Sequence, residues 1–192
     1  ADPSVSKFGD TYYLYGTTDL DYGLERAGTP VVWKSKDFVN WSFEGSHISD
    51  FDWSKGYEYT NDKGEKKKGY FRYWAPGRVI EHDGKFYLYV TFVKPGDKMG
   101  TYVLVADRPE GPFRFTEGKG LFVSGEEVDS PAIIDDIDGE PFIDDDGTGY
   151  IFWRRRNAAR LSADRLHLDG EPVTLKTTRQ GYSEGPVMFK RK

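Results

Sequence analysis

A short aromatic strand pattern occurs three times along the chain. In each copy a turn glycine is followed by a tyrosine, an aliphatic residue and another aromatic residue, at residues 9–15, 84–89 and 147–152. The first two turn glycines are 75 residues apart and the second and third are 63 apart. Such repetition indicates a supersecondary unit that buries its apolar face only by stacking on a neighbour. A four-stranded blade with long loops fits this spacing, so the repeat predicts an all-β propeller.

The segment before each turn glycine repeats as well. Ala75 precedes Gly84 by nine residues, and Asp138 precedes Gly147 by the same distance. Each segment is short, apolar and bounded by turn-forming residues, which is typical of a strand. We therefore predict that each segment is the innermost strand of a blade and turns back at its glycine.

Three acidic residues stand at the starts of these segments. Asp2 opens the first and Asp138 the third, while Glu184 opens a fourth copy, whose turn glycine is expected one residue beyond Lys192. In a propeller the innermost strands surround a central channel. We therefore expect the three acids to meet in space although they are far apart in the sequence.

The repeat also predicts the division of the chain into blades. We expect an incomplete propeller of about three blades plus the first strand of a fourth, whose remainder comes from further chain or from another chain, because a single strand would leave unpaired backbone groups. Residues 54–72 are rich in charge and contain a turn-like stretch, so they are interpreted as a mobile surface loop in preference to a lid. The expected boundaries are about 1–53 for blade one, 54–72 for the inter-blade loop, about 73–130 for blade two, about 131–182 for blade three and 183–192 for the start of blade four.

The composition excludes several classes of function. The net charge is −5 and basic runs are short, which argues against nucleic-acid binding. No run of 18 apolar residues exists, so no membrane segment is expected. The absence of cysteine excludes disulfides and thiolate metal sites but leaves the compartment open.

Because the chain starts without methionine, as after removal of a leader, a secreted or periplasmic location is expected, with the cytoplasm as the alternative. Aromatic residues make up 16% of the chain, which suits β-structure and carbohydrate binding alike.

The convergence of Asp2, Asp138 and Glu184 points to acid–base chemistry. Hydrolysis of a glycosidic bond needs one protonated and one ionised carboxyl group on either side of the bond. Acids crowded into a partly dry channel separate their pKa values, because like charges resist joint ionisation. Any one of these residues alone is better explained as a turn former or a surface acid. Their shared position in the repeat favours a catalytic role.

The residues themselves predict no metal and no cofactor. The acidic run that ends at Gly147 resembles a calcium loop, but Phe142 occupies the first ligand position, and a tight turn explains the run better. The three histidines, His47, His82 and His167, lie in dissimilar contexts without metal-ligand spacing.

Several short motifs together resemble glycoside hydrolase family 43, whose members are five-bladed propeller enzymes acting on arabinans, xylans and related polymers. They occur in the family's order along the whole chain, at Ala1-Asp2-Pro3, Tyr12-Tyr13-Leu14-Tyr15-Gly16, Ser35-Lys36-Asp37-Phe38-Val39-Asn40-Trp41, Trp74-Ala75-Pro76, Gly111-Pro112-Phe113, Ile137-Asp138-Gly139, Phe142-Ile143-Asp144-Asp145-Asp146-Gly147 and Ser183-Glu184-Gly185-Pro186. The resemblance implies an inverting glycosidase with Asp2 as general base, Glu184 as general acid and Asp138 as the residue that tunes the pKa of the acid. It implies a carbohydrate substrate, with arabinofuranosides and xylosides ahead of galactosides.

The sequence departs from the family pattern in two places. Gly77-Arg78 follows the Trp74-Ala75-Pro76 motif, where relatives commonly carry an acidic residue. A late channel histidine that often holds a metal or a water in the family is absent, although a channel calcium or other ion stays open for the complete domain. Trp74 is the candidate sugar-stacking platform, with a core position as its alternative. Arg78 is expected to meet either a substrate hydroxyl or another blade. The rival interpretation is a non-catalytic carbohydrate-binding propeller, or an inactive fragment of an enzyme.

Overall fold

The computed structural model describes residues 2–17, 28–49, 51–116, 130–178 and 181–191, and these residues are almost entirely strands and loops. The only helical element among them is one 3-10 turn, η1 (Arg154–Arg156). The predicted all-β class is therefore confirmed. Ala1 of the Ala1-Asp2-Pro3 motif and residues 117–129 of the predicted second blade lie outside the described residues. No helix in the described segments has the length and apolar character needed to cross a membrane.

The first sheet is an antiparallel meander that starts at the N-terminus. Gly9 has a φ of +59°, a conformation that favours glycine, and it makes the first turn of the sheet where the repeat predicts it. The strands follow one another in space in the order of the chain, as β1 (Ser4–Phe8), β2 (Thr11–Tyr15), β3 (Val31–Ser35) and β4 (Ser42–Ser46).

The second sheet has an interrupted innermost strand. β7 (Arg72–Trp74) and β8 (Ile80–His82) both pair with β9 (Lys85–Val93), which also pairs with β10 (Met99–Ala106). The residues between β7 and β8 leave regular pairing but remain attached, since the Gly77 N–H donates to the Tyr89 carbonyl at 2.7 Å. This interruption places the Ala75-Pro76 segment at the edge of the sheet, where it is available to a site.

The third sheet repeats the meander of the first. Gly147 has a φ of +83° and makes its first turn. The Asp144 carbonyl accepts from the Gly147 N–H at 2.9 Å, which confirms the predicted tight turn. The strands are β11 (Glu140–Ile143), β12 (Gly149–Trp153), β13 (Asn157–Leu161) and β14 (Leu168–Thr174), again in chain order.

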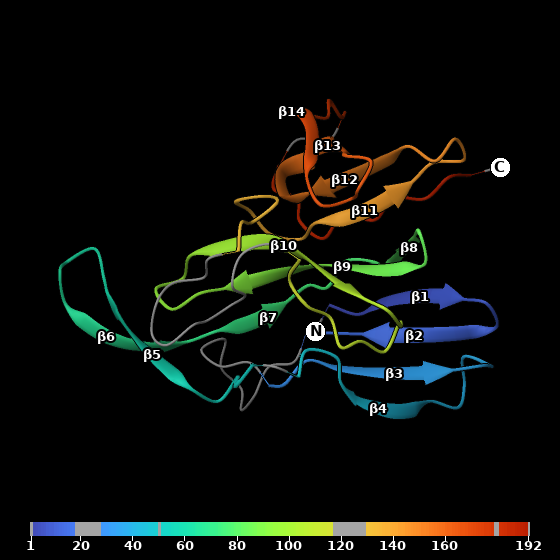
Figure 1. The fold of residues 1–192 in the computed structure, drawn as a ribbon. Coiled ribbons are helices and arrows are strands. Elements are labelled where there is room, and N and C mark those ends of the chain that lie inside the picture. Colours follow the sequence, from blue (N-terminus) through green and yellow to red (C-terminus); the bar gives the residue numbers. More distant parts are fainter. Residues whose placement is uncertain (1, 18–27, 50, 117–129, 179–180, 192) are drawn as a thin grey trace.

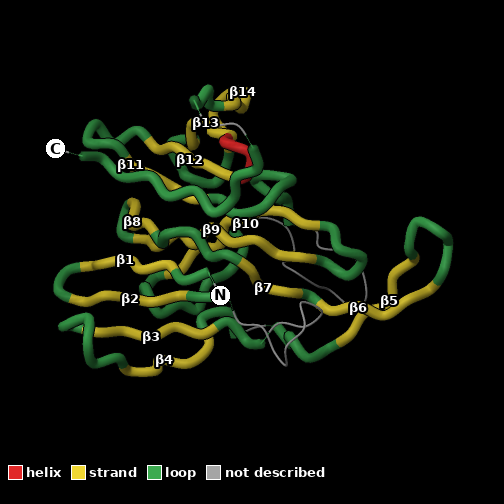
Figure 2. The backbone as a smooth tube through the Cα atoms, turned by 180° about the vertical axis from the view of Figure 1, so that it is seen from behind, coloured by secondary structure: helices red, strands yellow, loops and turns green. Residues whose placement is uncertain are grey.

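The three sheets are stacked face to face in chain order, as Figures 1 and 2 show from opposite sides. Strand β9 explains the stacking, because alternate side chains of a strand point to opposite faces. Leu88, Val90 and Phe92 belong to the core shared with the first sheet, whereas Tyr87 and Tyr89 belong to the core shared with the third. Successive sheets that bury each other's faces form part of a β-propeller, which confirms the predicted architecture.

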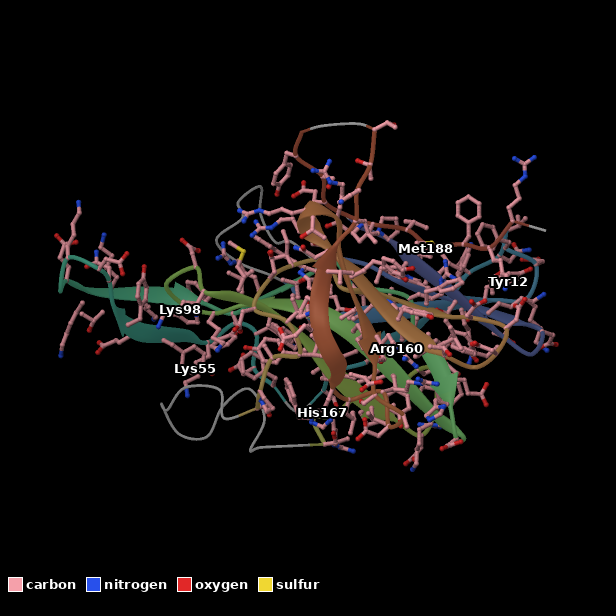
Figure 3. All side chains as sticks on the ribbon, turned by 90° about the horizontal axis from the view of Figure 1, so that it is seen from above. Tyr12, Lys55, Lys98, Arg160, His167 and Met188 are labelled. Carbon is pink, nitrogen blue, oxygen red and sulfur yellow. The ribbon has the colours of Figure 1, made fainter. Side chains whose placement is uncertain are left out.

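Residues 54–72 differ from the prediction of a mobile loop. They form a hairpin of β5 (Gly56–Thr60) and β6 (Lys66–Tyr70), which stands off one end of the stack in Figure 1. Tyr57 stacks on Phe51 with ring centroids 6.5 Å apart and meets Phe71 edge-on at 5.6 Å. These aromatic contacts anchor the base of the hairpin, although the charged side chains of the segment suggested a loop. Viewed from above, Lys55 and Lys98 lie at the hairpin end of the molecule and Tyr12 at the other (Figure 3).

Residues 183–191, which the repeat predicts as the first strand of a fourth blade, form no strand in the described structure. They run beside the third sheet, where Lys190 Nζ lies 2.7 Å from Asp144 Oδ1 and 2.8 Å from Asp145 Oδ2. A strand is defined by a ladder of hydrogen bonds to a neighbouring strand, whereas the backbone bond described for this segment joins the Arg155 N–H to the Ser183 carbonyl at 2.8 Å, and Arg155 lies in η1.

Candidate active site

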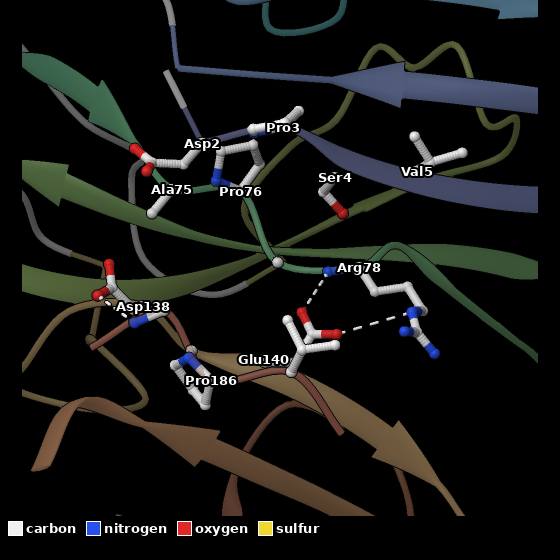
Figure 4. Close-up of a pocket in the computed structure, with 14 residues that line it drawn as sticks. Asp2, Pro3, Ser4, Val5, Ala75, Pro76, Arg78, Asp138, Glu140 and Pro186 are labelled. Carbon is white, nitrogen blue, oxygen red and sulfur yellow. Dashed lines mark hydrogen bonds and ion pairs between the residues drawn. The ribbon is translucent and has the colours of Figure 1, made fainter. Parts of the chain in front are cut away.

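A pocket of about 320 Å³ lies where the innermost segments of the three sheets converge. Its walls come from four separate stretches of the chain, residues 2–5, 75–78, 138–140 and 185–187. These are the stretches that the repeat predicts to be equivalent. The close-up in Figure 4 shows Asp2 and Asp138 toward one end of the pocket and Arg78 with Glu140 toward the other. The pocket thus holds two of the three predicted catalytic acids.

Asp138 is half-buried and in electrostatic contact with both other acids. Burial raises the pKa of Asp138 above its ordinary value, and the carboxylates of Glu184 and Asp2 raise it further, whereas the Gly185 N–H and the Arg154 charge oppose the rise. The Gly185 N–H donates to Asp138 Oδ2 at 3.0 Å. The three acids therefore lie close enough for the charge of two to affect the ionisation of the third.

Asp2 is exposed and is held at its carboxylate by a hydroxyl from the first sheet. Thr17 Oγ1 donates to Asp2 Oδ2 at 2.9 Å. Asp2 lies in a short segment before β1, so this bond is the contact that orients its side chain. One carboxylate oxygen remains for a water molecule or a substrate.

Glu184 is arranged differently from the other two acids. Its neighbours Gly185 and Pro186 line the main pocket, whereas Glu184 is among the residues that line an adjoining cavity of about 250 Å³. The exposed Tyr182 hydroxyl donates to Glu184 Oε2 at 2.6 Å. Arg154, which is hydrogen-bonded to Tyr182, therefore connects Glu184 to the third sheet. The structure therefore places Glu184 within electrostatic range of Asp138, at the edge of the pocket that holds Asp2 and Asp138.

Arg78 lines the pocket and contacts the next sheet. Its backbone N–H donates to Glu140 Oε2 at 2.9 Å, and its Nε lies 3.6 Å from Glu140 Oε1. Burial raises the pKa of Glu140, and the N–H and charge of Arg78 oppose that rise. Of the two expected roles for Arg78, the contact with another blade is present, and the contact with substrate stays a prediction.

Trp74 lies one residue before the pocket wall and is not among the residues that line it. The Arg72 guanidinium lies over its ring, 4.8 Å from the centroid. Its Nε1 is buried and has no hydrogen-bond partner among the described residues. With one ring face covered by Arg72, only the other face could stack on a sugar.

The described residues contain no group of three or more histidine or acidic side chains arranged to hold a metal ion.

Comparison with known proteins identifies the family. The family model of glycosyl hydrolases family 43 matches residues 1–192. The chain belongs to family 43. This confirms the resemblance that the short motifs indicate.

Two curated proteins and one solved structure illustrate the relationship. The chain is 29% identical to the beta-D-galactofuranosidase xynD of Aspergillus niger, covering 100% of this chain and 53% of that protein. It is also 29% identical to the extracellular exo-alpha-(1->5)-L-arabinofuranosidase ArbA of Cellvibrio japonicus, covering 85% and 44%. A solved glycoside hydrolase superimposes with a TM-score of 0.78 at 37% identity, covering 100% of this chain and 40% of that one. The family 43 chain thus spans about half the length of these curated relatives.

Several residues that bond to the acids of this family 43 site or act on their charge were not predicted from the sequence. Thr17 and Arg154 stand two residues beyond the last aromatic residue of the first and third repeated strands, and Thr91 holds that position in the second. Aligning the repeat two residues further would have found all three. No comparable signal marks Tyr182, because its contact with Glu184 depends on how the chain runs beside the third sheet.

Proposed function

We propose that the protein hydrolyses glycosidic bonds of plant-type polysaccharides or oligosaccharides with inversion at the anomeric carbon. Asp2 is the general base, Glu184 the general acid and Asp138 the residue that tunes and orients the acid. The observation that carries the proposal is the raised pKa of Asp138, which burial causes and to which both Glu184 and Asp2 add. A carboxyl group within electrostatic range of two others suits acid–base hydrolysis, which needs one protonated and one ionised carboxyl group.

The reaction divides between the two outer acids. Glu184 gives its proton to the glycosidic oxygen as the bond from that oxygen to the anomeric carbon breaks. Asp2 takes a proton from a water molecule, whose oxygen forms the new bond on the opposite face of the sugar. An inverting enzyme needs about 6.5–9.5 Å between the two carboxyl groups to admit this water. Asp138 supports the step because its negative charge keeps the proton on Glu184 until the leaving group needs it.

Arabinofuranosides and xylosides are the proposed substrates, with galactosides next. The names of the Aspergillus niger and Cellvibrio japonicus relatives, a galactofuranosidase and an arabinofuranosidase, support a terminal furanoside. Trp74 and Arg78 are proposed to contact the sugar. A secreted or periplasmic location is proposed, in keeping with the extracellular relative.

Further propeller structure, from the same or another chain, is proposed to complete the site. The relatives are longer, and the side chains of Val187 and Phe189, beside Glu184 in the sequence, are 70% and 72% exposed. On this proposal residues 1–53, 73–130 and 131–182 are three blades, and 183–192 opens the next.

A non-catalytic carbohydrate-binding propeller is the second candidate function. The observation that favours it is that Glu184 lines the adjoining cavity and not the main pocket, and that its carboxylate is bonded to Tyr182. An acid held away from the scissile bond would leave a pocket that binds sugar without cleaving it.

An activity screen distinguishes the two candidates. Aryl α-L-arabinofuranosides, β-D-xylosides and galactosides are incubated with the full natural chain and with its Glu184→Gln variant, and the anomeric configuration of the first product is followed by NMR. Hydrolysis with inversion that the variant loses supports the proposal. Saturable sugar binding without hydrolysis by the wild-type protein would establish the binding propeller instead.

A further inference from the structure

Two threonines occupy the same position in successive sheets. Thr17 stands two residues beyond Tyr15 at the end of β2, and Thr91 stands two residues beyond Tyr89 in β9. Each hydroxyl accepts a hydrogen bond from a backbone N–H nine residues before the next turn glycine. The donor is Ala75 for Thr17 and Asp138 for Thr91. Because the same contact recurs at equivalent positions, it is a structural feature that the blades share.

Thr17 joins the second sheet to Asp2. Its Oγ1 accepts from the Ala75 N–H at 2.9 Å and donates to Asp2 Oδ2 at 2.9 Å. A threonine hydroxyl has a single proton, and the bond from Ala75 occupies one of its lone pairs. The proton is thereby directed at Asp2, so the position of the carboxylate depends on the position of the second sheet.

Thr91 acts on the backbone of Asp138. It is fully buried, and its Oγ1 accepts from the Asp138 N–H at 3.0 Å. Asp138 has a φ of 65°, in the left-handed region that residues other than glycine rarely adopt. Ala75, at the equivalent position, has a φ of 40°. Strained backbone persists only where surrounding contacts hold it in place, and the threonine hydroxyls provide such a contact at both positions.

We propose that Thr17 and Thr91 are positioning residues of the active site, with different effects on the reaction. Thr17 holds the Asp2 carboxylate where it can activate water. Thr91 holds the Asp138 backbone, and through it the charge that keeps the proton on Glu184. The inference rests on the proposed function, because it assigns each threonine to one of the two proton transfers.

Substitution of Thr17 tests the first half. Thr17→Val keeps the shape of the side chain and removes the hydroxyl, whereas Thr17→Ser keeps the hydroxyl. With the full natural chain, Thr17→Val is expected to lower kcat by about 10- to 100-fold, the range for a lost hydrogen bond to a charged group. KM is expected to change little. The loss is expected to be similar for an activated aryl glycoside and a natural linkage, since water must be activated in both, and Thr17→Ser is expected to recover most of the rate.

Substitution of Thr91 tests the second half. Thr91→Val leaves the Asp138 N–H without its acceptor. Asp138 is then expected to shift, so that its charge no longer keeps the proton on Glu184. The variant should lose more activity on a natural linkage, whose leaving group needs protonation, than on an activated aryl glycoside. The ratio of kcat between the two substrates does not depend on how much of the variant is folded. This ratio is therefore informative even if the buried substitution lowers stability.

Thr11→Val is the matched control. Thr11 lies at the other end of β2 from Thr17, and its hydroxyl donates to Asp10 at an exposed turn, 2.9 Å away. The control is expected to keep wild-type kcat and KM. An active wild-type enzyme whose Thr17→Val variant keeps wild-type kcat, or whose Thr91→Val variant keeps it or loses it equally for both leaving groups, would overturn the inference and leave the proposed function intact. A wild-type protein that hydrolyses none of the glycosides would instead refute the proposed function.

Discussion

The Asp138 carboxylate accepts a hydrogen bond from the backbone N–H of Gly185 at 3.0 Å. This bond joins Asp138, which lies just before the third sheet, to the residue that follows Glu184. The acid and the residue proposed to tune it are therefore connected through one peptide unit. A change at Asp138 is expected to alter both the charge and the placement of Glu184.

Glu184→Gln is expected to affect substrates according to their leaving group. A leaving group that departs easily needs little protonation, so the variant should keep more activity on an activated aryl glycoside than on a natural linkage. General acid catalysis typically contributes about 10²–10⁴-fold, which sets the expected loss for the poor leaving group. The measurement is kcat/KM for both substrates. Equal losses on both would argue against Glu184 as the acid.

Asp2→Asn is expected to abolish activity on both kinds of leaving group alike. Water must be activated whichever group departs, so a loss of about 10²–10⁴-fold is expected on each substrate. Steady-state kinetics on the pair of substrates used for Glu184→Gln checks this. A variant that keeps its activity on the natural linkage would show that another group activates the water.

Asp138→Asn is expected to stabilise the fold while impairing catalysis. The pKa of Asp138 is raised by burial, so its ionised form destabilises the folded state at pH values above the raised pKa. That cost is absent below the unfolded-state value of about 3.8, where the carboxyl is protonated in both states. The Tm of the variant should therefore exceed that of the wild type at pH 7, and the difference should narrow as the pH falls toward 4. A lower Tm for the variant at pH 7 would contradict the expected cost of ionisation.

His47 is expected to contribute to acid unfolding. Burial lowers the pKa of His47 to about 3, and its Nε2 lies 3.0 Å from the Tyr73 hydroxyl in the first core. Because the unfolded pKa is near 6.5, unfolding takes up one proton between those two values, and stability falls as the pH drops below 6.5. Between pH 6 and pH 4 the free energy of unfolding should fall less steeply in His47→Gln than in the wild type. The difference between the two slopes should be about 1.4 kcal/mol per pH unit. Identical slopes for the two proteins would show that His47 does not take up this proton.

The aromatic core between the first two sheets is expected to dominate stability. Phe92 is fully buried, with its ring centroid 5.7 Å from that of Trp53 and 5.5 Å from that of Tyr102. Phe92→Ala should cost about 3–5 kcal/mol of unfolding free energy. Phe43, which is 62% exposed on the edge strand β4, provides the control, and Phe43→Ala should change it by about 0.5 kcal/mol or less. Similar costs in chemical denaturation would show that the core is not where the structure places it.

Local patterns in the sequence were sufficient to predict the three stacked sheets. The turn glycines Gly9, Gly84 and Gly147 all have positive φ, and each lies between two paired strands. Such features depend on neighbouring residues, because a turn with positive φ favours glycine and a strand buried on both faces needs apolar side chains at nearly every position. The alignment of the repeated segments correctly predicted that Asp2 and Asp138 lie in one pocket. The hairpin within residues 54–72 was missed because its anchoring contacts join Tyr57 near one end of this charged stretch to Phe71 near the other end and to Phe51 outside it.

The sequence by itself determined the class of fold and the family, and it predicted which three acids form the site. Only the tertiary structure decided that Tyr182 bonds to Glu184 and that Arg78 meets Glu140 of the next sheet. Turn and strand preferences act between residues near each other in the chain, so a repeat reveals them. Contacts between sheets join residues dozens of positions apart and depend on how the sheets stack and on which way each side chain turns. Those directions are set by packing, and no local pattern encodes them.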